Sequence, residues 1–237
     1  MQNTLSKKQV LAFYHDLFVQ QQVEHFKKIA FPNVERGRVV IDIGGGCGFF
    51  ASTIKKELNI LTRVIDMDPS SVQAARVLGV EALIGDALRP DKKGDETVAC
   101  FNLILHHLVA DSDDETLALQ AHAISTWREC NTNIFVNEYI YESWLGTFSG
   151  WIIYQITKNR FLSTFGMVVS KVLPSLRANT FGVGVRFRSN DEWKYIFEKC
   201  GFAIAAEQKG EKEFVSLPRR LLLIKEIRRN SFFLVAK

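Results

Sequence analysis

A glycine-rich turn between a strand pattern and a helix pattern constrains the fold more than any other feature. Arg38–Ile43 is a run rich in β-branched residues, Gly44–Gly48 follows it directly, and a helical pattern covers Phe49–Leu58. A continuous apolar strand is typical of a parallel sheet covered on both faces. Glycine lets a ligand approach the backbone, and the next helix offers free N–H groups. The turn therefore predicts an α/β fold, and by itself it leaves open a dinucleotide, a nucleoside or no ligand.

Strand and helix patterns alternate along the chain. Residues 4–30 have a helical period that ends at Pro32, and residues 142–188 lack a clear strand. Alternation of this kind predicts an α/β fold with a doubly wound, mostly parallel seven-stranded sheet, N-terminal helices and an inserted helical lid between strand 5 and the last helix. Right-handed crossovers place ligand sites at the carboxyl ends of the strands. The other predicted strands cover 61–66, 81–84, 97–105, 133–137, 202–208 and 231–236, and the other helices cover 69–78, 113–127 and 190–199.

Composition and charge exclude several classes of protein. Hydrophobic residues make up 47% of the 237-residue chain, which suits a globular domain. The net charge is +4 without a dense basic stripe, so no nucleic-acid partner is expected. The four cysteines form no C-x-x-C pair, so we expect no metal site and a reducing, cytoplasmic environment. Because a signal-peptide pattern and an apolar run of about 18 residues are both missing from the sequence, no transmembrane segment is expected.

Acidic residues follow three of the predicted strands, at points where parallel strands bring their ends together. Asp42 lies near the end of the first strand, Asp66 ends the second, and Asp86 comes just after the third. A carboxylate at the end of the second strand can accept two hydrogen bonds from ribose hydroxyls. Asp68 is an alternative to Asp66 for this role, and it can instead cap the helix that opens at Pro69. Asp86 can likewise bind a ligand or serve the turn in which it lies.

The spacing of these residues resembles that of the class I S-adenosylmethionine-dependent methyltransferases. The segment from Asp42 to Gly48 is similar to motif I of that family, an acidic residue followed by glycines at alternate positions, with Gly45 as an additional glycine. Its leading acid and compact glycine cluster differ from the dinucleotide fingerprint G-x-G-x-x-G. The resemblance covers roughly residues 36–137 and 187–237. It implies a Rossmann-like fold, with S-adenosyl-L-methionine as the cofactor.

The same resemblance implies a role for each matching position. Asp42 and the turn would hold the amino-acid end of the cofactor, Asp66 its ribose and Asp86 its adenine amino group. The segment Cys100–Leu108 is similar to the motif IV region of small-molecule methyltransferases and would lie near the sulfonium. The cofactor-binding residues implied are Asp42, Gly44, Gly46, Gly48, Asp66, Met67, Asp86, Ala87, Phe101 and Asn102.

Two other segments bear on the resemblance. The Phe-Asp pair that usually precedes the fourth strand is not obvious, and Asp95-Glu96 occupies its place only loosely. Near the C-terminus, Phe187–Trp193 and Glu198–Phe202 resemble the family's C-terminal signature, a marker of the fold and not of the chemistry. The expected organisation is an N-terminal helical cap over residues 1–35 and a Rossmann-like methyltransferase domain over 36–237, with the lid at about 142–186.

The implied chemistry is SN2 transfer of a methyl group to an O, N or C atom. His106 or His107 can remove a proton from a substrate hydroxyl, since imidazole titrates near neutrality, or the pair can fix its turn. Glu138, after the fifth strand, can orient an amine or hydroxyl or bind the lid. An aromatic-rich lid would exclude water and suits a small, largely hydrophobic acceptor of secondary metabolism. The expected pocket residues are Tyr14, His15, Trp144, Phe148 and Trp151.

Other functions remain open at this point. A repurposed member of the family would bind the cofactor without methylating, or would serve as an interaction protein through its apolar lid. A nucleic-acid methyltransferase would share the cofactor site, but the sequence lacks an Asn-Pro-Pro-Tyr type motif after the fourth strand. A dinucleotide-dependent oxidoreductase would need a true G-x-G-x-x-G turn. The expected partners are a small-molecule substrate and a second copy, in a homodimer formed through the N-terminal helices or the lid.

Overall fold

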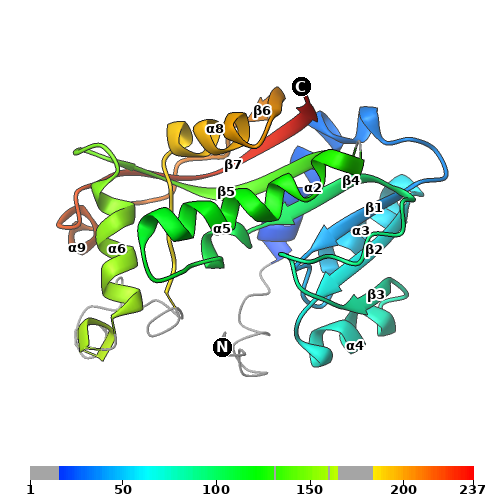
Figure 1. The fold of residues 1–237 in the computed structure, drawn as a ribbon, viewed down its shortest axis with the longest axis horizontal. Helices are drawn as coiled ribbons and strands as arrows, with labels where there is room; N and C mark the ends of the chain where they lie inside the picture. The colour runs from blue at the N-terminus through cyan, green and yellow to red at the C-terminus, as the bar shows by residue number, and fades with distance from the viewer. Residues whose placement is uncertain (1–15, 131, 160, 165–183) are drawn as a thin grey trace.

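The computed structural model describes residues 16–130, 132–159, 161–164 and 184–237. These residues build one sheet with seven strands in the spatial order β3-β2-β1-β4-β5-β7-β6 (Figure 1). Neighbouring strands are parallel except for β7, which runs antiparallel to both β5 and β6. The strands are β1 (Val39–Ile43), β2 (Leu61–Asp66), β3 (Glu81–Ile84), β4 (Glu96–Asn102), β5 (Asn133–Ser143), β6 (Phe202–Gln208) and β7 (Ile224–Ala236).

Helices cover both faces of the sheet (Figure 1). On one face lie α2 (Asp16–Ile29), α3 (Phe49–Leu58) and α4 (Pro69–Val77). On the other face lie α5 (Asp113–Ser125) and α8 (Asn190–Lys199). No described helix is long and apolar enough to cross a membrane. The remaining helical elements are η1 (Phe31–Asn33), η2 (Leu105–His107), η3 (Arg128–Cys130), α6 (Phe148–Lys158) and α9 (Leu217–Arg220).

Alternate residues of the central strands supply two separate cores. In β1, the Val40 side chain packs in a cluster with Phe26 of α2 and Phe50 of α3. Its neighbour Ile41 packs on the opposite face with Trp127 and with Trp193 of α8. Because each strand residue meets a helix on one face or the other, a strand in this position needs apolar residues without interruption. The sheet predicted from the sequence is confirmed, with its doubly wound, mostly parallel arrangement.

Several predicted strand boundaries in β4, β5 and β7 are wrong. The fifth strand continues to Ser143 instead of stopping at 137, and the last begins at Ile224 instead of 231. The parallel partner β4 pairs with β5 only as far as Asn137, and the antiparallel ladder to β7 then carries β5 onward to Ser143. The fourth strand ends at Asn102, three residues earlier than predicted. The part of the predicted first helix before residue 16 lies outside the described residues.

A chain segment returns to the sheet just before α8. Residues 184–188 form this segment, which reaches the extended part of β5 at Arg188, where the Tyr141 N–H donates to the Arg188 carbonyl at 3.0 Å. The α6 helix crosses close over this segment. A Cβ on Gly150 would lie 2.0 Å from the Phe187 carbonyl oxygen, so only glycine fits at the crossing. The return brings residues from the C-terminal third of the chain to the carboxyl ends of β4 and β5.

Candidate functional site

Four polar side chains lie at the carboxyl edge of the parallel strands. Asp42 lies in β1, Asp66 ends β2, Asp86 follows β3 and Asn102 ends β4. The strands are in register here, with Asp42 opposite Val64 of β2 and Asp66 opposite the last residue of β3. The sheet therefore gathers residues that are up to 60 positions apart in the sequence around the glycine turn.

The glycine turn is shaped by its own backbone and by the acid that precedes it. Gly44, Gly46 and Gly48 have φ angles of 66°, 54° and 75°, which residues with a Cβ rarely adopt. Gly45 has an ordinary φ but no room for a side chain, since its Cβ would lie 2.5 Å from Asp42 Oδ2. Gly45 is an additional glycine relative to motif I. Its closeness to Asp42 explains why a glycine is needed at this position.

Asp66 connects the second strand to the glycine turn. Its Oδ2 accepts a hydrogen bond of 2.8 Å from the Gly46 N–H, and its Oδ1 accepts one of 2.8 Å from the Asp68 N–H. Burial raises the pKa of Asp66, and the two backbone N–H groups partly oppose that rise. Asp68 caps α4 by accepting from the Ser70 and Ser71 N–H groups. Met67, between the two acids, is exposed.

Asp42 is the most deeply buried carboxyl group of this edge. Its side chain is 1% exposed, and its Oδ1 accepts a hydrogen bond of 2.9 Å from Asn102 Nδ2. Burial raises the pKa of Asp42 to about 7, the Asn102 hydrogen bond opposes this, and the nearby Asp66 charge adds to it. Asn102 Oδ1 is itself buried without a hydrogen-bond partner. Within the described residues, no cation pairs with Asp42 or Asp66, so the edge holds unmatched acceptors.

Three further residues of the predicted cofactor site have mainly structural surroundings. Asp86 is half-buried, and its Oδ1 accepts a hydrogen bond of 2.9 Å from the Leu88 N–H within its own turn. Ala87 and Phe101 are buried in the core cluster between the sheet and α5. Just after Asn102, Leu103 has a φ of 55°, and its N–H donates to the Asn137 carbonyl at 2.8 Å. Such strain in a residue with a side chain marks the point where β4 leaves the sheet.

The His pair lies in η2, which contacts the middle of β5 through Glu138. His106 Nδ1 is 2.7 Å from Glu138 Oε2, and Glu138 Oε1 accepts a hydrogen bond of 2.7 Å from the Leu105 N–H. Because a carboxylate only accepts, Nδ1 carries the proton and Nε2 is left as the basic nitrogen. Burial, followed by the neighbouring His106, holds the pKa of His107 well below its usual range. The two histidines are thus unlike, and Glu138 orients only His106.

An aromatic cluster surrounds His106. The Phe187 ring stacks on the His106 ring at 4.9 Å and on the Tyr141 ring at 4.3 Å, and Tyr139 contacts both His106 and Phe187 edge to face. The sequence pattern treats Phe187 only as part of a fold marker. The Arg186 N–H donates to the His106 carbonyl at 2.9 Å, which pins the returning segment to the His pair. The signal that was available is the run of alternating residues Val185–Ser189, typical of a strand-like segment.

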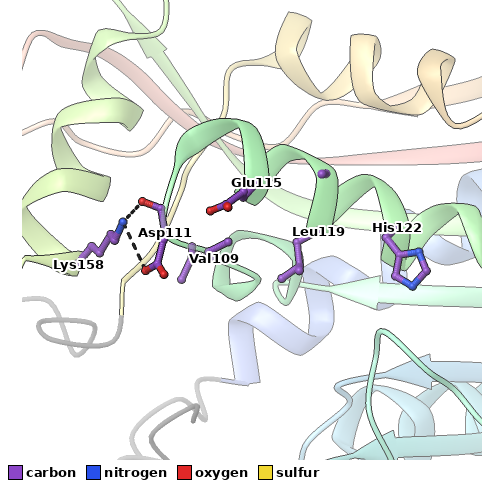
Figure 2. A pocket seen from close by; sticks show the side chains of 8 residues that line it. Val109, Asp111, Glu115, Leu119, His122 and Lys158 are labelled. Atoms are coloured by element: carbon purple, nitrogen blue, oxygen red, sulfur yellow. Dashed lines mark hydrogen bonds and ion pairs between the residues drawn. The ribbon is translucent and has the colours of Figure 1, made fainter.

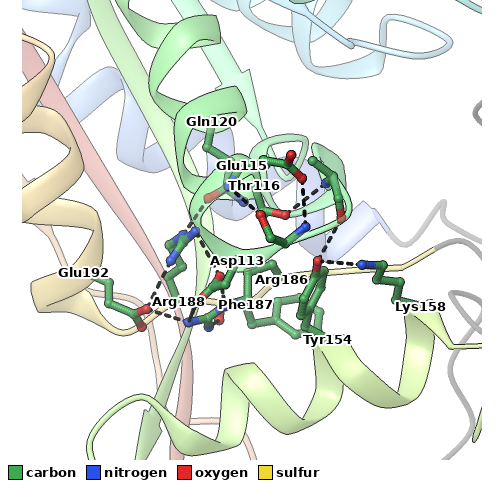
Figure 3. Close-up of polar contacts among 12 residues, drawn as sticks. Asp113, Glu115, Thr116, Gln120, Tyr154, Lys158, Arg186, Phe187, Arg188 and Glu192 are labelled. Carbon is green, nitrogen blue, oxygen red and sulfur yellow. Dashed lines mark hydrogen bonds and ion pairs between the residues drawn. The ribbon is translucent and has the colours of Figure 1, made fainter.

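Two buried arginines anchor that segment to α5 and α8 (Figure 3). Arg186 is 1% exposed and pairs with Asp113 at the start of α5 and with Glu192 in the first turn of α8. Arg188 joins the same Glu192 and donates to Gln120. Both guanidinium groups are therefore matched by carboxylates, which is the condition for burying them at acceptable cost. The network fixes Phe187, which lies between the two arginines in the sequence.

A wide, open groove of about 730 Å³ lies next to the His pair in sequence (Figure 2). The first residue that lines it is Val109, two positions after His107. Apolar residues and ionisable residues both line it, and Lys158 of α6 reaches Asp111 across its end. The groove runs along one face of α5, whose Glu115, Leu119 and His122 point toward it (Figure 2). Its lining is Val109, Ala110, Asp111, Glu115, Ala118, Leu119, His122 and Lys158.

The predicted pocket residues fall in different places. Tyr14 and His15 lie outside the described residues. Phe148 and Trp151 pack against each other on α6 at 5.9 Å, and Trp151 is partly exposed. Trp144 lies past the end of β5, where it is 66% exposed and has the Lys225 ammonium 5.4 Å from its ring centre. In the described part of the chain, no group of three or more His, Cys, Asp or Glu side chains is placed to hold a metal ion.

No protein-family model matches the sequence, and no curated protein matches it either. Many solved structures nevertheless share its fold. The MccD protein is 13% identical, with a TM-score of 0.60 over 94% of this chain and 97% of its own. Geranyl diphosphate C-methyltransferase from Streptomyces coelicolor, solved with S-adenosyl-L-homocysteine, is 11% identical, with a TM-score of 0.59 over 98% and 84%. Magnesium protoporphyrin IX methyltransferase from Synechocystis, also with that ligand, is 15% identical, with a TM-score of 0.55 over 100% and 90%.

Proposed function

We propose that this chain, which has the fold of the class I S-adenosylmethionine-dependent methyltransferases, transfers the methyl group of that cofactor to an O, N or C atom of a small, largely hydrophobic acceptor. The supporting observation is the unmatched carboxyl edge. Asp42 is buried with a pKa raised to about 7, and Asn102 Oδ1 lies beside it without a donor. Burying a polar group without a partner is costly, so such an edge suits a ligand that brings positive charge and N–H donors.

The cofactor fits these groups. Its α-ammonium would bring a positive charge to Asp42 and an N–H donor to Asn102 Oδ1. At Gly44, Gly45 and Gly48 of the turn, a Cβ would clash with neighbouring atoms, so only backbone borders the ligand there. Each Asp66 oxygen accepts one backbone hydrogen bond and keeps capacity for a second, which matches two ribose hydroxyls. When bound, the cofactor supplies a methyl group activated by its sulfonium. The neighbouring solved structures support the assignment because several of them hold this cofactor or its product.

His106 is the proposed general base where the acceptor is a hydroxyl or amine that must lose a proton. Glu138 acts as a positioning residue, because it fixes the imidazole and stabilises its protonated form without touching the acceptor. The rings of Phe187 and Tyr139 form an apolar wall beside His106, which suits a hydrophobic acceptor and excludes water. His107, with its lowered pKa, stays neutral at pH 7 and serves the turn.

The shared premise is tested by isothermal titration with S-adenosylmethionine and with its demethylated product, S-adenosylhomocysteine. We expect both to bind in the micromolar range that is common for enzyme ligands. NADH and ATP are the matched competitors, since they carry adenosine without the amino-acid end. Binding of NADH in preference to S-adenosylmethionine, or no binding of either methyl cofactor, would contradict the proposal.

Turnover is tested with a panel of phenolic, isoprenoid and amine acceptors and a labelled methyl group. For a hydroxyl acceptor, Glu138→Gln should lower kcat by about 10²-fold while leaving the cofactor affinity unchanged, because proton removal contributes 10² to 10⁴ in rate. Folding of the variant is checked by circular dichroism. An unchanged kcat, or a loss confined to cofactor affinity, would remove Glu138 and His106 from the reaction. Cofactor binding without turnover on any panel member would favour a repurposed, non-methylating protein.

A further inference from the structure

The paired strands β5 and β7 extend past the parallel half of the sheet and end in an exposed apolar surface. Its side chains come from the turn after β5 and from the segment around α9, at the left of Figure 1. Each is between 62% and 84% exposed. We call this surface the apolar tip, and it consists of Trp144, Leu145, Phe214, Leu217 and Leu221.

Hydrogen bonds to the backbone carbonyls of Leu222 and Leu223 hold the two halves of the apolar tip together. The Trp144 N–H donates to the Leu223 carbonyl at 3.0 Å, and the Ser149 hydroxyl donates to the Leu222 carbonyl at 2.8 Å. Beneath them, Val215, Ile224 and Ile227 form a buried cluster of their own. The core of this end of the molecule is thus complete without the tip side chains. The tip side chains are therefore not needed to fill this core, and an exposed apolar surface of this kind is typical of an interaction site.

The net positive charge of the chain comes from the segment that includes the α9 part of the tip. The segment 209–229 contains seven Lys and Arg residues and three Glu residues, a net charge of +4. The whole chain also has a net charge of +4, so its remaining residues are balanced. Two of the three glutamates are matched inside the segment, Glu226 by Lys212 and Arg228 and Glu213 by Arg229. The third, Glu211, is exposed.

Two basic residues are mixed into the apolar tip itself. Lys225 is exposed, with its ammonium 5.4 Å from the centre of the Trp144 ring, and Arg220 is exposed between Leu217 and Leu221. The cores of protein interfaces are depleted in Lys, whereas Trp, Leu and basic residues together are typical of surfaces that lie in a lipid headgroup region. Indole rings favour that depth because they are apolar with one polar N–H group.

We infer that the apolar tip is a peripheral membrane-binding surface that takes up anionic phospholipid bilayers. Its leucines and Trp144 enter the boundary between headgroups and acyl chains, and Arg220 and Lys225 contact the headgroup phosphates. This inference does not depend on the proposed methyl transfer, since the tip lies beyond the part of β5 that pairs with β4 and shares no residue with the proposed cofactor site.

Sedimentation with extruded vesicles tests the inference, using phosphatidylcholine alone and phosphatidylcholine with about 30% phosphatidylglycerol, a typical anionic content. The wild-type chain should bind the anionic vesicles more tightly than the neutral ones. The double variant Leu217→Ser, Leu221→Ser should weaken this binding by about tenfold or more, given the free energy of burying a leucine. The double variant Arg220→Gln, Lys225→Gln should weaken it by about fivefold for each charge removed.

Matched controls come from exposed residues elsewhere on the molecule. Val77→Ser on α4 removes an apolar side chain that is 78% exposed, and Lys56→Gln on α3 removes an exposed charge. Both should leave vesicle binding unchanged. Tryptophan fluorescence adds a local readout: anionic vesicles should shift the emission to shorter wavelength, and Trp144→Phe should abolish most of that shift.

Three results would overturn the inference. The first is no sedimentation of the wild-type chain at millimolar lipid. The second is equal loss of binding in the tip variants and in the Val77→Ser and Lys56→Gln controls. The third is a dimer in analytical ultracentrifugation that the Leu217→Ser, Leu221→Ser variant converts to monomer, because the tip would then be an interface between two copies of the chain.

Discussion

The amino edge and the carboxyl edge of the same parallel strands both contain buried carboxyl groups. The carboxyl groups at the amino edge pair with a cation and, within the part of the chain that the structure describes, those at the carboxyl edge do not. At the amino edge, Arg63 of β2 is 3% exposed and pairs with Asp95 at 2.8 Å, Glu96 at 2.9 Å and Glu81 at 3.0 Å. At the carboxyl edge, Asp42 accepts from the Asn102 amide and Asp66 accepts from the Gly46 N–H, and neither has a cation partner among the described residues.

The pKa values follow this difference. Hydrogen bonds from Arg63 lower the pKa of Asp95, whereas burial raises the pKa of Asp42 to about 7 and also raises that of Asp66. Buried acids that lack a cation partner and have raised pKa values are typical of ligand-binding sites. We therefore infer that a ligand supplies the missing positive charge at the carboxyl edge. The amino edge is therefore structural, and the carboxyl edge is where we place the cofactor.

The largest expected effect is the loss of the structural edge. Arg63→Ala leaves Glu96, which is 1% exposed, as a buried charge without its partner and should lower the free energy of unfolding by about 3–5 kcal/mol. Lys93→Ala removes a half-exposed partner of Glu81 and should cost no more than about 1 kcal/mol. Urea unfolding measures both. Equal effects would show that burial does not distinguish the two cations.

The next effect separates two adjacent acids. Asp66→Ala should weaken S-adenosylmethionine binding by about 10- to 100-fold, because hydrogen bonds to a charged group contribute about 1.5–3 kcal/mol. Asp68→Ala should instead lower stability by about 1 kcal/mol through loss of the α4 cap, with cofactor affinity unchanged per folded molecule. Titration calorimetry and thermal unfolding together test this pair. If Asp68→Ala weakens binding as much as Asp66→Ala does, the ribose assignment is wrong.

The sequence predicts these local features better than the distant ones. The glycine turn, its strand and the helix cap at Asp68 depend on neighbouring residues, so their patterns are visible in a single sequence. The length of β5 depends on its antiparallel partner β7, about 90 residues away, and was underestimated. The contact of Phe187 with His106 requires a segment that returns after α6. The alternation in residues 185–189 indicates an extended segment there, but it does not show which part of the sheet that segment contacts.

A smaller effect concerns the shape of the turn. Gly45→Ala places a Cβ 2.5 Å from Asp42 Oδ2 and must displace either the turn or the carboxyl group. We expect the cofactor affinity to fall by about tenfold, in line with a strain of about 1–3 kcal/mol for overpacking. Gly79→Ala is the control, since its backbone φ of 79° strains the chain but no atom lies within 4 Å of the new Cβ. A wild-type affinity for Gly45→Ala would show that Asp42 does not fix the turn.

The most direct test of the account is the proton balance of cofactor binding, measured by calorimetry in buffers of different ionisation enthalpy between about pH 5.5 and 7.5. The pKa of Asp42 is about 7 without ligand, and an α-ammonium beside it would lower that value. Cofactor binding should therefore release up to one proton below pH 7. The cofactor affinity should rise with pH by at most about tenfold per pH unit and should level off above pH 7. Asp42→Asn should bind with no such proton release. Proton uptake, or the same release in Asp42→Asn, would contradict the claim that this unmatched acid awaits a cationic cofactor.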